Sequence, residues 1–170
     1  LKAVFFDVGG TLETYRSSPG LRLENTYHFR ECLAKAGICM DENDEHLCQR
    51  ITSGIANYQK WNQQSFIELP SDQIWAKYVF ADLGITEAEL APIAEELSFI
   101  HETRFFLRER RPVIPRVLEQ IREMGLLTGC ISNTHSLTQV PFNLRRYGIN
   151  SILSPVVLSS EFGGRKPDPS

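Results

Sequence analysis

The sequence predicts an α/β protein with a parallel sheet whose strands are separated by a long helical insertion. Apolar, strand-like segments occupy residues 1–7, 126–131 and 155–159. A helical pattern lies between the second and third of them, and strand, helix and strand in that order imply parallel pairing with a right-handed crossover. About ninety residues between the first two strands are dominated by helical spacing, so we expect an all-helical insertion there.

The composition is that of a soluble globular protein. The 170 residues are 42% hydrophobic and 23% charged, which is enough to bury a core without disulfides. The formal net charge of −3 does not favour nucleic acid or an anionic membrane as a partner. The sequence shows neither a signal peptide nor an apolar run of membrane-spanning length, so we expect a cytoplasmic protein that binds a small molecule.

The first strand ends in the segment Asp7-Val8-Gly9-Gly10-Thr11-Leu12. In open α/β sheets, ligands bind at the carboxyl edge of the strands. A carboxylate at that edge, next to backbone N–H groups of a glycine turn, suits nucleophilic attack on a phosphoryl or carbon centre. The alternative interpretation is an ordinary turn after a strand.

The insertion carries several helical signals. Hydrophobic spacing predicts helices at about residues 23–36, 47–58, 71–83 and 86–100. Ser71 is a candidate cap of the third helix, and Thr86 with Glu89 forms a capping-box pattern at the start of the fourth. We expect residues 15–20 and 108–112 to link the insertion to the core.

The predicted domain boundaries follow from these linkers. Residues 15–108 are expected to form a helical cap, and residues 1–14 with 109–170 the α/β core. In the core we expect helices at about 113–124 and 137–147.

Two further polar segments follow the later strands. The second strand runs into Ser132-Asn133, where a hydroxyl and backbone N–H groups can bind an anion, or where the serine caps the next helix. The third strand runs into a Gly/Pro-rich loop containing Lys166, which is either directed at the same pocket or solvated. Since the carboxyl ends of parallel strands share one edge, we expect Asp7, Ser132 and Lys166 to converge.

At this point the chain resembles the haloacid dehalogenase-like (HAD) hydrolase superfamily. Residues 7–12 look like its first motif, Ile131-Ser132-Asn133 its second, and Arg165-Lys166-Pro167-Asp168 its third. The helical insertion falls where the family places a C1-type cap. The resemblance implies a Rossmann-like, three-layer parallel core with an inserted all-helical cap subdomain.

The resemblance also implies roles for particular residues. Asp7 is the implied nucleophile, Ser132 binds the transferring group, and Lys166 neutralises charge on the nucleophile and the phosphoryl oxygens. The implied cofactor is Mg²⁺, bound by Asp7 and by the main-chain carbonyl of Gly9. The substrate-binding residues suggested by the same motifs are Gly10, Thr11 and Asn133.

This sequence departs from the family pattern in two ways. Gly9 stands where the family's phosphatases have a second aspartate, the general acid/base, and such groups typically contribute ~10²–10⁴-fold to the rate. Relatives that cleave carbon–halogen bonds, or transfer phosphoryl groups from nucleotides, also lack this aspartate. The fourth motif, which supplies a further acidic metal ligand, is expected beyond Ser170, so the predicted core is C-terminally incomplete.

Three functions remain open from the sequence. The first is a Mg²⁺-dependent phosphatase acting on a small phosphorylated metabolite. The second is a 2-haloacid dehalogenase-like C–halogen hydrolase with the same nucleophile, and the third is a catalytically silent relative that acts as a binding or regulatory module. Cap residues expected near the pocket are Tyr58, Lys60, Trp61, Asn62 and Gln63.

Overall fold

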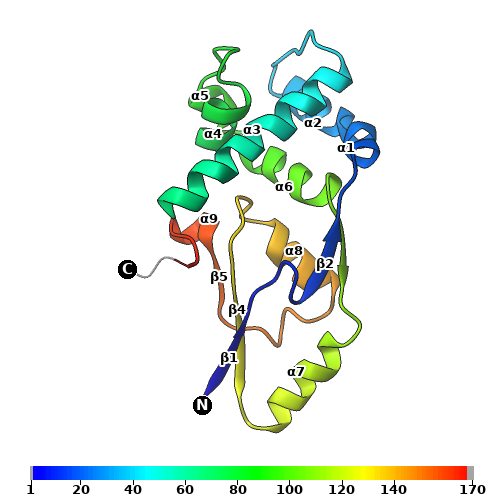
Figure 1. Cartoon of the computed structure of the whole chain (residues 1–170), viewed down its shortest axis with the longest axis vertical. Helices are drawn as coiled ribbons and strands as arrows, with labels where there is room; N and C mark the ends of the chain where they lie inside the picture. The colour runs from blue at the N-terminus through cyan, green and yellow to red at the C-terminus, as the bar shows by residue number, and fades with distance from the viewer. Residues whose placement is uncertain (1, 168–170) are drawn as a thin grey trace.

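A computed structural model describes residues 2–167 and shows an elongated α/β molecule, with a helical part at one end and a parallel sheet at the other (Figure 1). The sheet contains β1 (Ala3–Phe6), β4 (Leu127–Ser132) and β5 (Val156–Leu158) in the order β1-β4-β5. Both pairings are parallel. The α/β class and the parallel sheet predicted from the sequence are therefore confirmed.

Two of the helices of this part, α7 (Ile114–Glu123) and α8 (Gln139–Arg146), lie close to their predicted positions, whereas the short α9 (Ser159–Phe162) was not predicted. α7 precedes β4, α8 connects β4 to β5, and α9 follows β5. The apolar faces of α7 and α8 pack on one hydrophobic cluster, whose fully or nearly fully buried members include Val8, Leu12, Leu118, Cys130, Val140, Leu144 and Leu158. This cluster fixes the two strand ends that carry Asp7 and Ser132.

β1 is more exposed than the sequence predicted. Within residues 2–167 it pairs on one side only, with β4, and Phe5 is 50% exposed. In the register of that pair, Phe6 lies opposite Cys130. Asp7 therefore leaves the sheet at the same edge at which β4 ends in Ser132.

The helical part has a hydrophobic core of its own, made of buried residues between 29 and 105. Its helices are α1 (Pro19–Asn25), α2 (Tyr27–Lys35), α3 (Asp44–Ser65), α4 (Ser71–Ile74), a π-helical continuation of α4 (Trp75–Val79), α5 (Glu87–Leu90) and α6 (Ala94–Arg104). Trp75 is fully buried near the rings of Phe29 and Phe80. The separate cores indicate that two hydrophobic units share this chain.

Helix boundaries differ from the predicted ones at three places. The first predicted helix is split at Thr26, whose hydroxyl donates to the Arg22 carbonyl at 2.9 Å. The last is split before Ala94, just after Pro92, while its capping box at Thr86 is confirmed. Ser71 caps no helix, because its hydroxyl donates to the His135 carbonyl at 3.0 Å.

The two predicted linkers contain a strand each. β2 (Glu13–Arg16) and β3 (Leu107–Arg110) form an antiparallel ribbon in which Tyr15 lies opposite Arg108. The chain thus enters and leaves the helical part side by side (Figure 1). The division at residues 14/15 and 108/109 stays a prediction, and the ribbon spans both points. Among the described helices, none combines the length and apolarity needed to cross a membrane.

Candidate active site

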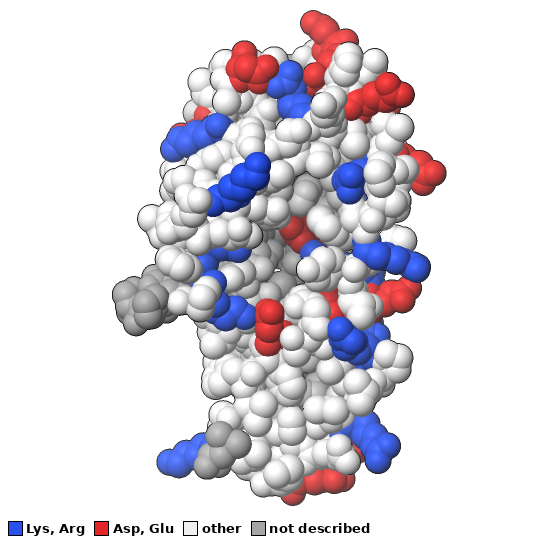
Figure 2. All heavy atoms as spheres, in the orientation of Figure 1, with Lys and Arg blue, Asp and Glu red and all other residues white. Residues whose placement is uncertain are grey.

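Asp7, Ser132 and Lys166 line one cavity of about 390 Å³ between the sheet edge and the helical part. Figure 2 shows the surface hollowed at this level, with acidic and basic side chains around the opening. The other lining residues are Val8, Gly9, Glu13, Tyr15, Gln59, Glu102, Phe106, Arg108, Asn133, Gln139 and Val140. The convergence expected from three strand ends is therefore present in the structure.

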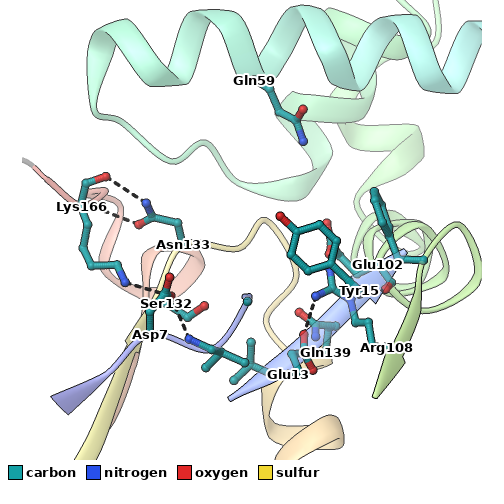
Figure 3. A pocket seen from close by; sticks show the side chains of 14 residues that line it. Asp7, Glu13, Tyr15, Gln59, Glu102, Arg108, Ser132, Asn133, Gln139 and Lys166 are labelled. Carbon is teal, nitrogen blue, oxygen red and sulfur yellow. Dashed lines mark hydrogen bonds and ion pairs between the residues drawn. The ribbon is translucent and has the colours of Figure 1, made fainter. Parts of the chain in front are cut away.

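The Asp7 carboxylate is held by a cation and a backbone amide. Lys166 Nζ lies 3.0 Å from Oδ1 of Asp7, and the Val8 N–H donates to the same oxygen at 2.8 Å. The Asp7 side chain is 47% exposed, so it remains open to the cavity (Figure 3). Both of these hydrogen bonds end on Oδ1, and among the described residues none donates a hydrogen bond to Oδ2.

Asn133 positions the lysine. Its side-chain amide donates to the Lys166 carbonyl at 2.9 Å and its oxygen accepts from the Lys166 N–H at 3.0 Å (Figure 3). This reciprocal pair ties the loop after β5 to the end of β4. Substrate binding by Asn133 stays a prediction, and the structure shows the amide engaged with the lysine backbone.

Ser132 is the last residue of β4, is only 5% exposed, and lines the cavity. It does not cap the following helix, because α8 begins at Gln139. The strand delivers its hydroxyl to the pocket, which favours the anion-binding interpretation over the capping one.

The turn after β1 divides the predicted first-motif residues. Gly9 lines the cavity, whereas Gly10 and Thr11 are not among the residues that line it. The Val8 carbonyl accepts hydrogen bonds from the N–H groups of Thr11 and Leu12 at 3.2 and 2.9 Å, so the chain folds back directly after Gly9. Gly10 and Thr11 therefore lie within this turn, and their role in substrate binding stays a prediction.

The far half of the cavity carries a buried charge network that sequence reasoning missed. Arg108 forms ion pairs with Glu13 and Glu102. Glu13 is fully buried and also accepts from Asn143 at 3.0 Å and from the Tyr147 hydroxyl at 2.8 Å. Such partners are what a buried carboxylate requires.

The sequence carries one signal of this network, in the segment that it predicts to be a linker (residues 108–112). Arg108 belongs to a short basic cluster that favours a solvated linker. Its alternation with Glu109 and Arg110 has the period of a strand, and the ribbon turns residues 108 and 110 to the more buried face. The missing information was the partner strand.

Glu102, which lines the cavity, and its neighbour His135 both have displaced pKa values. Burial lowers the pKa of His135 to about 4, against the opposing effect of Glu102. Burial alone would raise the pKa of Glu102, but His101, His135 and Arg108 together lower it. At neutral pH the network therefore contains ionised Glu102 and neutral His135.

The ligand atoms of His101, Glu102 and His135 lie within 4.8 Å of one another, a spacing that suits a metal ion. The Arg108 guanidinium, however, is bonded to Oε2 of Glu102. A cation placed there would meet that guanidinium at close range, which disfavours metal binding. We assign this cluster to the contact between α6 and the loop after β4.

Two carboxylates of the helical part, Glu95 and Glu68, accept hydrogen bonds from residues of the sheet part. Glu95 of α6 accepts from the hydroxyl of Ser136 at 2.7 Å and from the N–H groups of Leu137 and Thr138 at 2.9 and 3.0 Å. Glu68 accepts hydrogen bonds from Ser159 and Arg165. These contacts connect the helical part to the loops that follow β4 and β5.

Of the cap residues predicted near the pocket, none lines it. Gln59 of the same segment does, and it points from α3 toward the cavity (Figure 3). Tyr58 and Asn62 are buried instead, since α3 turns them to the helical core. A shift of one position along a helix rotates a side chain by about 100°, which the sequence pattern alone did not resolve.

A curated relative aligns with nearly the whole of this sequence. The chain is 30% identical over 170 residues to the glyceraldehyde 3-phosphate phosphatase of Methanopyrus kandleri, covering 99% of this chain and 66% of that protein. The similarity extends across the three motif segments whose side chains meet in the cavity. The chain belongs to the haloacid dehalogenase-like hydrolase superfamily. It spans about two thirds of that HAD relative's length.

Other comparisons add less. The sequence matches no family model. Among solved structures, a predicted phosphoglycolate phosphatase from Haemophilus somnus gives a TM-score of 0.49 at 14% identity, covering 98% of this chain and 66% of that one. A HAD phosphatase from Thermococcus onnurineus gives a TM-score of 0.49 at 18% identity, covering 99% of this chain and 67% of that one. Similarity at this level does not establish the substrate of this HAD chain.

Proposed function

We propose that this protein is a HAD phosphatase that hydrolyses a small phosphorylated metabolite, with Asp7 as the nucleophile. The observation that supports it best is the contact of Asp7 with Lys166 at 3.0 Å, in a cavity that Ser132 also lines. A carboxylate, a cation and a hydroxyl at one strand edge suit the capture and transfer of a phosphoryl group.

In the proposed reaction, a carboxylate oxygen of Asp7 attacks phosphorus and the bond from phosphorus to the ester oxygen breaks. The Ser132 hydroxyl donates a hydrogen bond to a phosphoryl oxygen, and the Lys166 ammonium offsets the negative charge that gathers there. Water then attacks phosphorus, the bond between phosphorus and Asp7 breaks, and inorganic phosphate leaves. The first step thus converts the Asp7 carboxylate into an acyl phosphate, and the second step restores it for the next turnover.

The residues fit a Mg²⁺ ion. Asp7 and Gly9 line the same cavity, and Mg²⁺ prefers oxygen ligands, using one or two carboxylates together with waters and substrate phosphate. We propose that the Asp7 carboxylate and the Gly9 carbonyl hold it. When bound, the ion supplies charge neutralisation for the phosphoryl oxygens.

The far half of the cavity supports a substrate whose other end is uncharged. The lining contains three carboxylates (Asp7, Glu13, Glu102) and two cations, Arg108 and Lys166. Both cations are already paired with these carboxylates. A second anionic group on the substrate would meet unfavourable potential there, whereas hydroxyl or carbonyl groups can bind Gln59 and Gln139. A triose phosphate, as in the name of the Methanopyrus kandleri relative, has this character.

The test is turnover of glyceraldehyde 3-phosphate, 2-phosphoglycolate and aryl phosphates by the full-length protein, with and without Mg²⁺. We expect the first to be preferred over phosphoglycolate and Asp7→Asn to abolish all turnover. Asp41→Asn, at an exposed position of the helical part, is the matched control and should keep full activity. Turnover of 2-haloacids in place of phosphate esters, or of neither class, would refute the phosphatase proposal.

A further inference from the structure

Gly9 leaves open the space next to the nucleophile, and Tyr15 lies beside it. A Cβ atom built on Gly9 would have the Cε1 atom of Tyr15 as its neighbour, at 3.7 Å. Both residues line the cavity that contains Asp7. In Figure 3 the hydroxyl end of the Tyr15 ring points into the cavity, toward the side where Ser132 and Asp7 lie. A phenol therefore occupies the neighbourhood of the missing side chain.

Tyr15 is 54% exposed, and its ring has Phe106 and Arg108 as neighbours. It packs edge-on against Phe106, with ring centroids 6.0 Å apart and an interplanar angle of 81°. On the ribbon it lies opposite Arg108, whose Cζ is 5.4 Å from the ring centroid. Arg108 is itself fixed by Glu13 and Glu102. These ring contacts favour an orientation in which the hydroxyl is directed into the cavity, within which an acid catalyst has to lie.

We infer that Tyr15 is the proton donor to the leaving oxygen, in the role that a side chain at residue 9 cannot fill. The inference rests on the proposed phosphatase activity. As Asp7 attacks phosphorus and the ester bond breaks, the departing oxygen takes the Tyr15 proton and leaves as an alcohol. The resulting phenolate then takes a proton from the water that attacks the aspartyl phosphate, which restores the phenol.

The test compares two substrates that differ in their need for a proton. Tyr15→Phe should lower kcat/KM for glyceraldehyde 3-phosphate by ~10²-fold or more, the lower end of the range for a general acid. For p-nitrophenyl phosphate, whose leaving group is stable as an anion, the loss should stay below ~3-fold because this acid is not needed. Equal losses for the two substrates, or no loss for either, would overturn the inference.

A second variant distinguishes proton donation from packing. Adding Gly9→Asp to Tyr15→Phe places a carboxylate next to the ring, in ordinary van der Waals contact with it. The double variant should recover ~10-fold or more of the lost turnover of the alkyl phosphate, because a carboxylic acid can serve as the donor. Absence of any recovery in a folded double variant would count against the proton-donor role.

The control is Tyr27→Phe, which makes the same chemical change on α2 at a residue outside the cavity lining. It should leave both substrates unaffected. Failure of the wild-type protein to hydrolyse either phosphate would refute the phosphatase proposal itself. Retained wild-type activity with equal losses in Tyr15→Phe would refute only the role of Tyr15.

Discussion

His135 should make the stability of this protein depend on pH in a range where most side chains do not titrate. It is 6% exposed, and it faces Glu102 and His101 of α6, Arg108 of β3 and Arg165. Its Nε2 has no hydrogen-bond partner among the described residues. Burial therefore keeps the imidazole neutral in the folded state, whereas in the unfolded chain it gains a proton with the ordinary pKa of histidine.

The sign and size follow from the two pKa values. The pKa is about 4 in the folded state and 6.5 as the ordinary value, so the unfolded state binds the proton first as pH falls. The stability contribution is complete above pH 6.5 and is lost between about 6.5 and 4. Between pH 7.5 and 5.0, linkage gives a loss of about 2 kcal/mol. The pKa of Glu102 is lowered from its ordinary value of 4.5, so its contribution to stability is lost only as the pH falls below that value.

The assay is urea unfolding of wild type and His135→Gln at pH 7.5 and 5.0. The readout is the change in the free energy of unfolding between the two pH values, which does not depend on the absolute stability of the variant. We expect that change to be smaller in His135→Gln by about 2 kcal/mol. His46→Gln, at an exposed position of α3, should behave like wild type. Equal changes in wild type and His135→Gln would refute the buried neutral state of this histidine.

Two further predictions concern the helical part and its attachment. Gly54→Ala should cost ~1–3 kcal/mol, since a Cβ would lie 2.6 Å from the Tyr78 carbonyl oxygen and 2.7 Å from Val79 Cα. The control is Gly20→Ala, where a Cβ would meet open space, and it should change stability by less than ~0.5 kcal/mol. Similar melting temperatures for the two variants would contradict the tight packing of α3 at Gly54. Glu95→Ala should cost ~1–2 kcal/mol, because it removes the acceptor for N–H groups at the start of α8. Glu96→Ala, which breaks a surface ion pair with Lys35, should cost ~0–1 kcal/mol, so an equal effect of both in chemical denaturation would argue against the Glu95 contact.

The elements that the sequence predicted well are those whose signal is local. The apolar runs of β4 and β5, the periodicity of α7 and the capping box at Thr86 depend on neighbouring residues. The convergence of Asp7, Ser132 and Lys166 followed from a general rule of parallel sheets. Local patterns and one topological rule were enough to place the pocket.

What the sequence did not predict depends on pairing between distant segments. β2 and β3 lie more than ninety residues apart, and only their pairing turns Tyr15 and Arg108 toward the cavity. The path of the chain after Gly9 depends on hydrogen bonds to the Val8 carbonyl, in a turn whose direction composition does not encode. These features depend on tertiary contacts, which is why the sequence assigned no role to Tyr15 and Arg108.

The most direct measurement is the site of covalent phosphorylation during turnover. Rapid quenching with labelled substrate, followed by borohydride reduction and peptide mass analysis, converts an aspartyl phosphate to homoserine at the reacting position. Homoserine at residue 7 in the wild type, and none in Asp7→Asn, is the result that this account requires. Label retained on another residue, or turnover that survives in Asp7→Asn, would contradict it.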